Sequence, residues 1–226
     1  MVSSHLHSPG DELMSRLMAG DMDGEVENRL LHELQNGYPV IKVRRLLQSD
    51  DETVVAAGMW IASELGGQAR PLFAEIVDRI HHPSFRVRFF SLDCLATCAR
   101  PEDTRALMLG LDLLDDPEPG VRWKALMFLT GLSEPQLRAA SAAATEQDVA
   151  PHRRGLELLL HVCSSRDTAS VSSALASDNP MLRRYAAAAA ARLAHQDPRV
   201  LREAMGCADP VIKQFAADIA SRIALK

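Results

Sequence analysis

The stretch DDPEPGVRWKALMFLTGL, residues 115–132, joins a turn rich in Asp and Pro to a run of aliphatic and small residues. Asp and Pro favour the first turn of a helix, because the carboxylate accepts hydrogen bonds from free N–H groups and Pro has no N–H to leave unsatisfied. The chain repeats this plan of a turn, an anchor residue, usually a basic residue and a helix. The six anchors are Val54, Val87, Val121, His152, Leu182 and Ile212, at spacings of 33, 34, 31, 30 and 30 residues. A repeat of this length predicts a stack of helix pairs.

Each of these helices has one face without charge. With the anchor as position 0, positions 4, 7, 8 and 11 lie on one side of a helix of 3.6 residues per turn. In the six copies these positions hold no charged residue, although 24 % of the chain is charged. We therefore expect this face to form the core. Position 4 is nearly always small, which would let neighbouring helices approach closely.

Shorter amphipathic segments precede the anchored helices, and each is predicted to be the first helix of a pair. They cover residues 39–48, 70–80, 103–114, 134–144, 167–176 and 197–205. Two more helices are expected upstream, at residues 10–20 and 24–37. The predicted organisation is a flexible segment at residues 1–10 and a single repeat domain at 11–226. Within that domain, residues 11–37 form an N-terminal cap and 38–226 form the repeats.

The consensus of the copies, Asp-Pro-x-x-Val-Arg-x-x-Ala followed by a Leu-rich helix, resembles the HEAT repeat over residues 38–226. The best matches are Val87-Arg88, Val121-Arg122 and Leu182-Arg183. The first copy departs at Val55, where Arg is expected, and the fourth departs at His152, where an aliphatic anchor is expected. The resemblance implies an all-α fold, a right-handed α-solenoid of about six helix pairs with an N-terminal helical cap, whose second helices line a concave face. HEAT arrays perform unrelated tasks, so the resemblance defines the fold and not the function.

Composition excludes several classes of protein. The sequence has no run of eighteen apolar residues and no secretion signal in its first ten residues, so we expect a cytoplasmic protein with no membrane partner. It has no Gly-rich phosphate loop, GxSxG or HExxH motif, so no catalytic residue, metal site or cofactor is predicted. The cysteines contain no CxxC pair and are expected to be core thiols: Cys94, Cys98, Cys163 and Cys207.

Charge is unevenly distributed along the chain. Residues 1–150 carry 14 Lys and Arg against 23 Asp and Glu, whereas residues 151–226 carry 11 against 7. A protein that wraps nucleic acid needs a continuous basic surface, so this distribution argues against nucleic acid as the partner. It favours a basic protein partner on the acidic part.

Positions 2, 3 and 6 of the second helices would face a bound partner. They predict an apolar strip flanked by two acidic residues, and the candidate partner-binding residues are Trp60, Glu64, Phe89, Asp93, Trp123 and Met127. Trp and Met are favoured at interfaces because they bury a large area. The same rings could instead pack between repeats as core, and the sequence leaves both interpretations open.

The basic residues that follow the anchors have a structural and a functional interpretation. Arg88, Arg122, Arg183 and Lys213 could bind phosphate, but pairing with the aspartates of the turns is the favoured interpretation. The pairs Arg153-Arg154 and Arg183-Arg184 exceed that need and could form a small basic surface.

These features favour a non-catalytic, protein-binding scaffold over an enzyme. The single acidic helical-repeat domain resembles bacterial immunity proteins that neutralise toxins. One alternative is an enzyme similar to the HEAT-like DNA-alkylation glycosylases, with Asp93 as the acid near Trp60 and Trp123, or to the phycobilin lyases. Another is an assembly or adaptor factor that joins two larger subunits.

Overall fold

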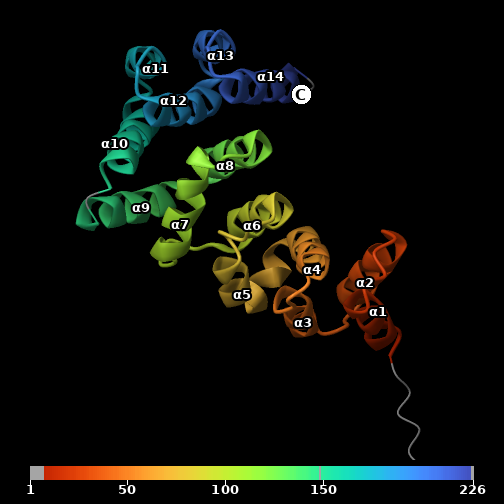
Figure 1. Cartoon of the computed structure of the whole chain (residues 1–226). Helices are drawn as coiled ribbons and strands as arrows, with labels where there is room; N and C mark the ends of the chain where they lie inside the picture. Colours follow the sequence, from red (N-terminus) through yellow and green to blue (C-terminus); the bar gives the residue numbers. More distant parts are fainter. Residues whose placement is uncertain (1–7, 148, 225–226) are drawn as a thin grey trace, which may run out of the picture. The chain divides into compact units, whose positions relative to one another are not determined.

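The computed structural model describes residues 8–147 and 149–224, and the regular elements in this part of the chain are all helices (Figure 1). The predicted all-α fold of helix pairs is confirmed. The chain divides into two compact units, Met1–Cys98 and Ala99–Lys226. No helix of the described residues is long and apolar enough to cross a bilayer.

The first unit contains the predicted cap and the first two helix pairs. Its elements are α1 (Pro9–Met18), α2 (Glu25–Gln35), η1 (Val40–Val43), α3 (Arg44–Leu47), α4 (Glu52–Glu64), η2 (Gly66–Leu72), α5 (Phe73–Asp78) and α6 (Phe85–Cys98).

The second unit contains the remaining four pairs. Its elements are α7 (Thr104–Asp112), η3 (Leu113–Asp115), α8 (Pro119–Gly131), α9 (Glu134–Glu146), α10 (Ala150–Ser165), α11 (Thr168–Leu175), α12 (Pro180–Leu193), α13 (Pro198–Met205) and α14 (Pro210–Ala224).

The start of the chain differs slightly from the predicted boundaries. The cap expected at residues 11–37 consists of α1 and α2. Helix α1 already begins at Pro9, because the Ser8 hydroxyl accepts a hydrogen bond from the Asp11 N–H and Pro9 occupies the first turn. The rest of the predicted flexible segment, residues 1–7, lies outside the described residues.

The repeat register agrees with the observed helices. Each of the six anchors is the third residue of its helix, from Val54 in α4 to Ile212 in α14. In the copies that contain α4, α6, α8 and α12 all four positions assigned to the core face are buried. Half-buried positions occur in α10, at Leu160 and Cys163, and in α14, at Ile219, Ala220 and Ile223. Gly58 shows why position 4 is small: a Cβ there would lie 2.6 Å from the Leu46 Cβ.

Arginines that follow the anchors hold the turns of the repeats. The Nη1 atom of Arg88 donates to the carbonyl oxygens of His82 and Pro83, at 2.9 and 2.7 Å. Arg122 and Arg183 donate to turn carbonyl oxygens in the same way. Asp209 caps a helix, because its carboxylate accepts from the N–H of Val211 at 2.8 Å, and its other oxygen lies 4.0 Å from Arg184 Nε. These arginines therefore have a structural role in which they bind backbone carbonyl oxygens of the turns. The sequence did not indicate these backbone contacts.

Within the second unit, helices distant in sequence pack together. Helix α8 contacts both α12 and α14. Arg192 of α12 reaches the C-terminal end of α8, where its Nη2 donates to the carbonyl oxygens of Leu129, at 3.2 Å, and Leu132. A guanidinium suits this place because the free carbonyls at a helix end carry partial negative charge.

Candidate partner-binding groove

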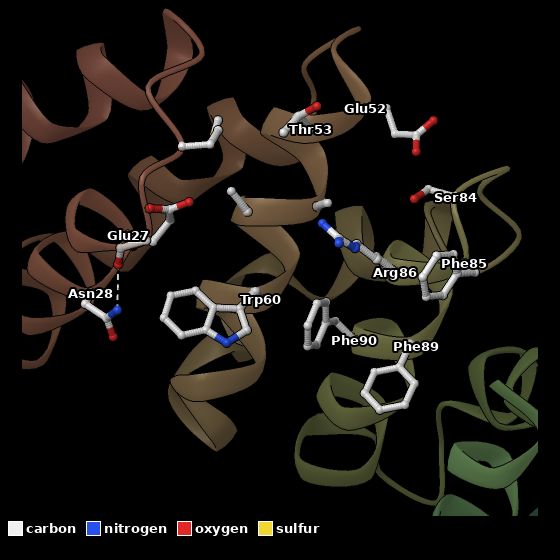
Figure 2. A pocket seen from close by; sticks show the side chains of 14 residues that line it. Glu27, Asn28, Glu52, Thr53, Trp60, Ser84, Phe85, Arg86, Phe89 and Phe90 are labelled. Carbon is white, nitrogen blue, oxygen red and sulfur yellow. Dashed lines mark hydrogen bonds between the residues drawn. The ribbon is translucent and has the colours of Figure 1, made fainter. Parts of the chain in front are cut away.

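A groove of about 780 Å³ lies in the first unit, across α2, α4 and α6. Figure 2 shows four aromatic side chains around it: Trp60 from α4, and Phe85, Phe89 and Phe90 from α6. Phe85 is 51 % exposed, which is unusual for so large an apolar side chain. The rings of Phe89 and Phe90 meet edge to face, with centroids 5.5 Å apart.

The repeat register explains how these rings come together. Trp60 occupies position 6 of α4, and Phe89 and Phe90 occupy positions 2 and 3 of α6, all of which were expected to face a partner. Small residues Ala56 and Ala57 fill positions 2 and 3 of α4, so the groove keeps its depth between the larger rings.

Three charged side chains also line the groove. Glu27 comes from α2, Glu52 from the first turn of α4 and Arg86 from α6. Glu27 is half-buried, and its Oε2 atom is buried without a hydrogen-bond partner among the described residues. The surroundings are acidic, because residues 1–98 carry 14 Asp and Glu against 9 Lys and Arg, and residues 99–226 carry 16 of each.

The structure brings together part of the predicted strip. Trp60 and Phe89 line one groove, whereas Glu64 is exposed on α4 and Asp93 is half-buried on α6, both outside the groove lining. Sequence reasoning did not single out Phe85, Phe90 or Glu27. Phe90 lay at a position already expected to face the partner and could have been found. Glu27 could not, because it lies on a cap helix, outside the repeats that define the register.

Trp123 and Met127 lie on α8 in the second unit, where both are half-buried. The Trp123 Nε1–H donates to the Asp218 carboxylate of α14 at 2.9 Å. Gln214, on the same helix, donates to the other oxygen of Asp218 at 2.8 Å. For Trp123 the structure thus shows packing within its unit, which is the alternative that the sequence left open.

His152, the anomalous anchor, belongs to a buried polar cluster of the second unit. Its Nδ1 atom lies 2.9 Å from the Tyr185 hydroxyl, and its Nε2 atom lies 3.1 Å from a carboxylate oxygen of Asp112. Burial raises the pKa of Tyr185 well above its ordinary value. Gly155 makes room for the Tyr185 ring, because a Cβ at position 155 would lie 2.2 Å from that ring. The polar anchor is therefore satisfied by two hydrogen-bond partners.

The basic pairs are partly committed to structural contacts. Arg184 is nearly buried and its Nη1 lies 2.6 Å from an oxygen of Asp115. Arg183 donates to the Ser177 carbonyl at 2.7 Å. Arg154 lines a second, shallower hollow of about 700 Å³ with serines of α11.

Two of the four cysteines are buried, as predicted for core thiols. Cys94 and Cys98 are buried, and burial raises the pKa of both thiols, which disfavours the reactive thiolate. Cys163 and Cys207 are half-buried. Among the described residues, no group of three or more His, Cys, Asp or Glu side chains is placed to hold a metal ion.

Comparison with known proteins finds similarity among solved structures only. No protein-family profile matches the chain, and no curated protein matches it significantly. Two engineered proteins from the Northeast Structural Genomics Consortium are each 16 % identical. One has a TM-score of 0.47 over 95 % of this chain and 91 % of its own, and the other 0.44 over 80 % and 96 %. A designed armadillo repeat protein is 13 % identical, with a TM-score of 0.45 over 80 % of this chain and 98 % of its own. The helical-repeat assignment rests on the helices of this chain.

Proposed function

We propose that this protein is a non-catalytic binding scaffold that holds a segment of a partner protein in the groove across α2, α4 and α6. The observation that carries the proposal is the gathering of Trp60, Phe85, Phe89 and Phe90 around one groove, with Phe85 half-exposed. Aromatic anchors in a concave site are the usual centres of binding energy at protein interfaces. The acidic balance of residues 1–98 supports a basic partner.

Selection of random peptides displayed on phage tests whether the groove binds protein segments. The best peptide is then titrated by fluorescence polarisation against wild type and a Trp60→Ala/Phe89→Ala double variant. Removing two aromatic anchors should weaken binding by about thirtyfold or more. Circular dichroism and the thermal midpoint check that the variant keeps its fold.

Trp123→Phe is the matched control, because it changes the other tryptophan of the chain outside the groove. It should leave the peptide affinity unchanged. If the double variant binds selected peptides as tightly as wild type, or if no peptide is selected, the groove is not the binding site and the proposal fails.

The finer hypothesis is that the partner is a toxin and that the scaffold is a bacterial immunity protein acting in the cytoplasm. This hypothesis requires that the bound partner protein lose its toxic activity. Co-expression with a protein that carries the selected peptide sequence decides this, because an immunity protein restores growth to cells that its partner poisons. An adaptor or assembly factor would bind through the same groove but would not rescue growth.

A further inference from the structure

The Glu27 carboxylate is the unusual feature of the groove. One of its oxygens is buried without a hydrogen-bond donor in the described part of the chain. A buried carboxylate oxygen without a donor is unfavourable, since water is excluded and no protein group replaces it. The residue as a whole is half-buried and lines the groove, so it lies within the surface that a bound segment would cover.

We propose that this groove recognises an Arg or Lys side chain of the partner, held by Glu27 and the Trp60 ring, with apolar partner residues next to it on Phe85, Phe89 and Phe90. This inference rests on the proposed function and specifies the partner's chemistry. In the view of Figure 2, Glu27 and Trp60 lie toward one side of the groove, and Phe85 and Phe89 toward the other. Glu27 lies on α2 and Trp60 on α4, two helices that pack together.

A carboxylate beside a tryptophan selects a cation for two reasons that act together. The carboxylate supplies an ion pair, and the face of the indole ring attracts a cation through its quadrupole. Arg and Lys can also lay their aliphatic stems on the neighbouring rings. An anionic segment would meet two carboxylates, Glu27 and Glu52, in a unit that already carries excess negative charge.

Arg86 does not already fill this role. It also lines the groove but comes from α6, and in the view of Figure 2 its side chain is drawn above Phe90. The buried Glu27 oxygen has no hydrogen bond with it or with any other described residue. Because Arg86 is itself positively charged, a bound cation is expected to lie nearer Glu27 than Arg86.

The test uses the peptides selected against the full-length protein. Sequencing should show Arg or Lys enriched at one position beside aromatic or aliphatic residues. The selected peptide is then synthesised with that Arg and with citrulline, which has nearly the same shape but no charge. Wild type should bind the Arg peptide about tenfold more tightly, as expected for a cation that pairs with a half-buried carboxylate beside Trp.

Glu27→Gln should remove this preference while leaving the affinity for the citrulline peptide unchanged. Glu52→Gln is the matched control, because it neutralises an exposed carboxylate of the same groove and should retain most of the preference. A Glu27→Gln protein that still prefers Arg over citrulline would overturn the inference.

The two proposals can fail separately. If peptides are selected and depend on Trp60 and Phe89 but carry no enriched cation, the groove binds protein segments without a cationic anchor, and only this inference is lost. If no peptide depends on Trp60 and Phe89, both are lost. Rising salt offers a second readout, since it should weaken the Arg peptide more than the citrulline peptide.

Discussion

The first unit packs its helices in sequence order, whereas the second returns on itself. In residues 8–98, α2 contacts α4 and α4 contacts α6, which leaves a groove across the three helices. In residues 99–224, α12 and α14 both pack on α8. The tryptophans show the consequence, because Trp60 lines the groove and Trp123 is hydrogen-bonded to Asp218 of α14. One repeat pattern can therefore place an aromatic side chain in a groove or use it for packing within the unit.

Because each unit holds one of the two tryptophans, fluorescence can report on each unit separately. The largest effect is expected from Gly155→Ala in a Trp60→Phe background. The new Cβ would lie 2.2 Å from the Tyr185 ring, and the ring must move within a packed core. We expect a loss of about 3 kcal/mol in the free energy of unfolding, measured by urea denaturation through Trp123.

Gly131→Ala is the matched control, because nothing lies within 4 Å of a Cβ at that position. It should change the free energy of unfolding by less than about 1 kcal/mol. An unchanged urea midpoint for Gly155→Ala would show that Tyr185 is not held as tightly as the second unit's packing implies.

Much of the fold followed from periodicity, because the signal is local. The anchor is the third residue of each second helix, from Val54 to Ile212, since a turn of Asp, Asn or Pro sets where each helix starts. The same register placed Trp60 and Phe89 where they could meet. It could not place Trp123 against Asp218, because these residues are 95 positions apart and periodicity carries no information about which helices fold back.

His152 shows a second limit of sequence reasoning. As a residue at an aliphatic position it reads as a departure from the repeat, but the departure is compensated by Tyr185 and Asp112 from other helices. Glu27 shows the same limit for the site. Its importance lies in a buried oxygen without a donor, and burial of a single atom leaves no trace in the spacing of residues.

Tyr185→Phe should have the next largest effect and is confined to the second unit. It keeps the ring but removes the hydroxyl 2.9 Å from the buried His152 Nδ1, which is then left without that partner. We expect a loss of about 2 kcal/mol in the free energy of unfolding, followed through Trp123. Equal stability of the variant and wild type would mean that the cluster adds nothing to the second unit.

Asp218→Ala tests the attachment of α14 to α8. It removes the acceptor for both the Trp123 indole and the Gln214 amide, at a place that is only half-buried. The expected loss is about 1 kcal/mol, together with a red shift of Trp123 emission as the ring gains contact with water. Trp60 emission and peptide binding should not change. A loss of peptide binding would contradict the separation of groove and second unit on which the comparison depends.

The smallest effect is expected at the cap of the first unit, where pH is the variable. The Asp11 carboxylate accepts hydrogen bonds from Lys42 Nζ at 2.6 Å, from Tyr38 at 2.7 Å and from Ser8 at 3.0 Å. These partners, Lys42 first, hold the pKa of Asp11 well below its ordinary value of 3.8. A carboxyl whose pKa is lowered by folding stabilises the folded state above its unfolded pKa, and this contribution is lost as pH falls through the folded value.

Hydrogen exchange of the α1 amides measures this contribution directly. Protection of α1 in wild type should decline as pH falls below about 4, after correction for the intrinsic pH dependence of exchange. In Asp11→Asn the α1 amides should already be less protected than in wild type at neutral pH. Their exchange should be faster by less than about tenfold, as expected for the loss of an exposed ion pair. Because the Asn variant cannot titrate, its corrected protection should be flat where that of wild type declines. Parallel curves would mean that α1 is held by its buried Leu13, Met14 and Leu17 alone. The charged cluster would then be incidental to the packing of α1 on the groove helix α2.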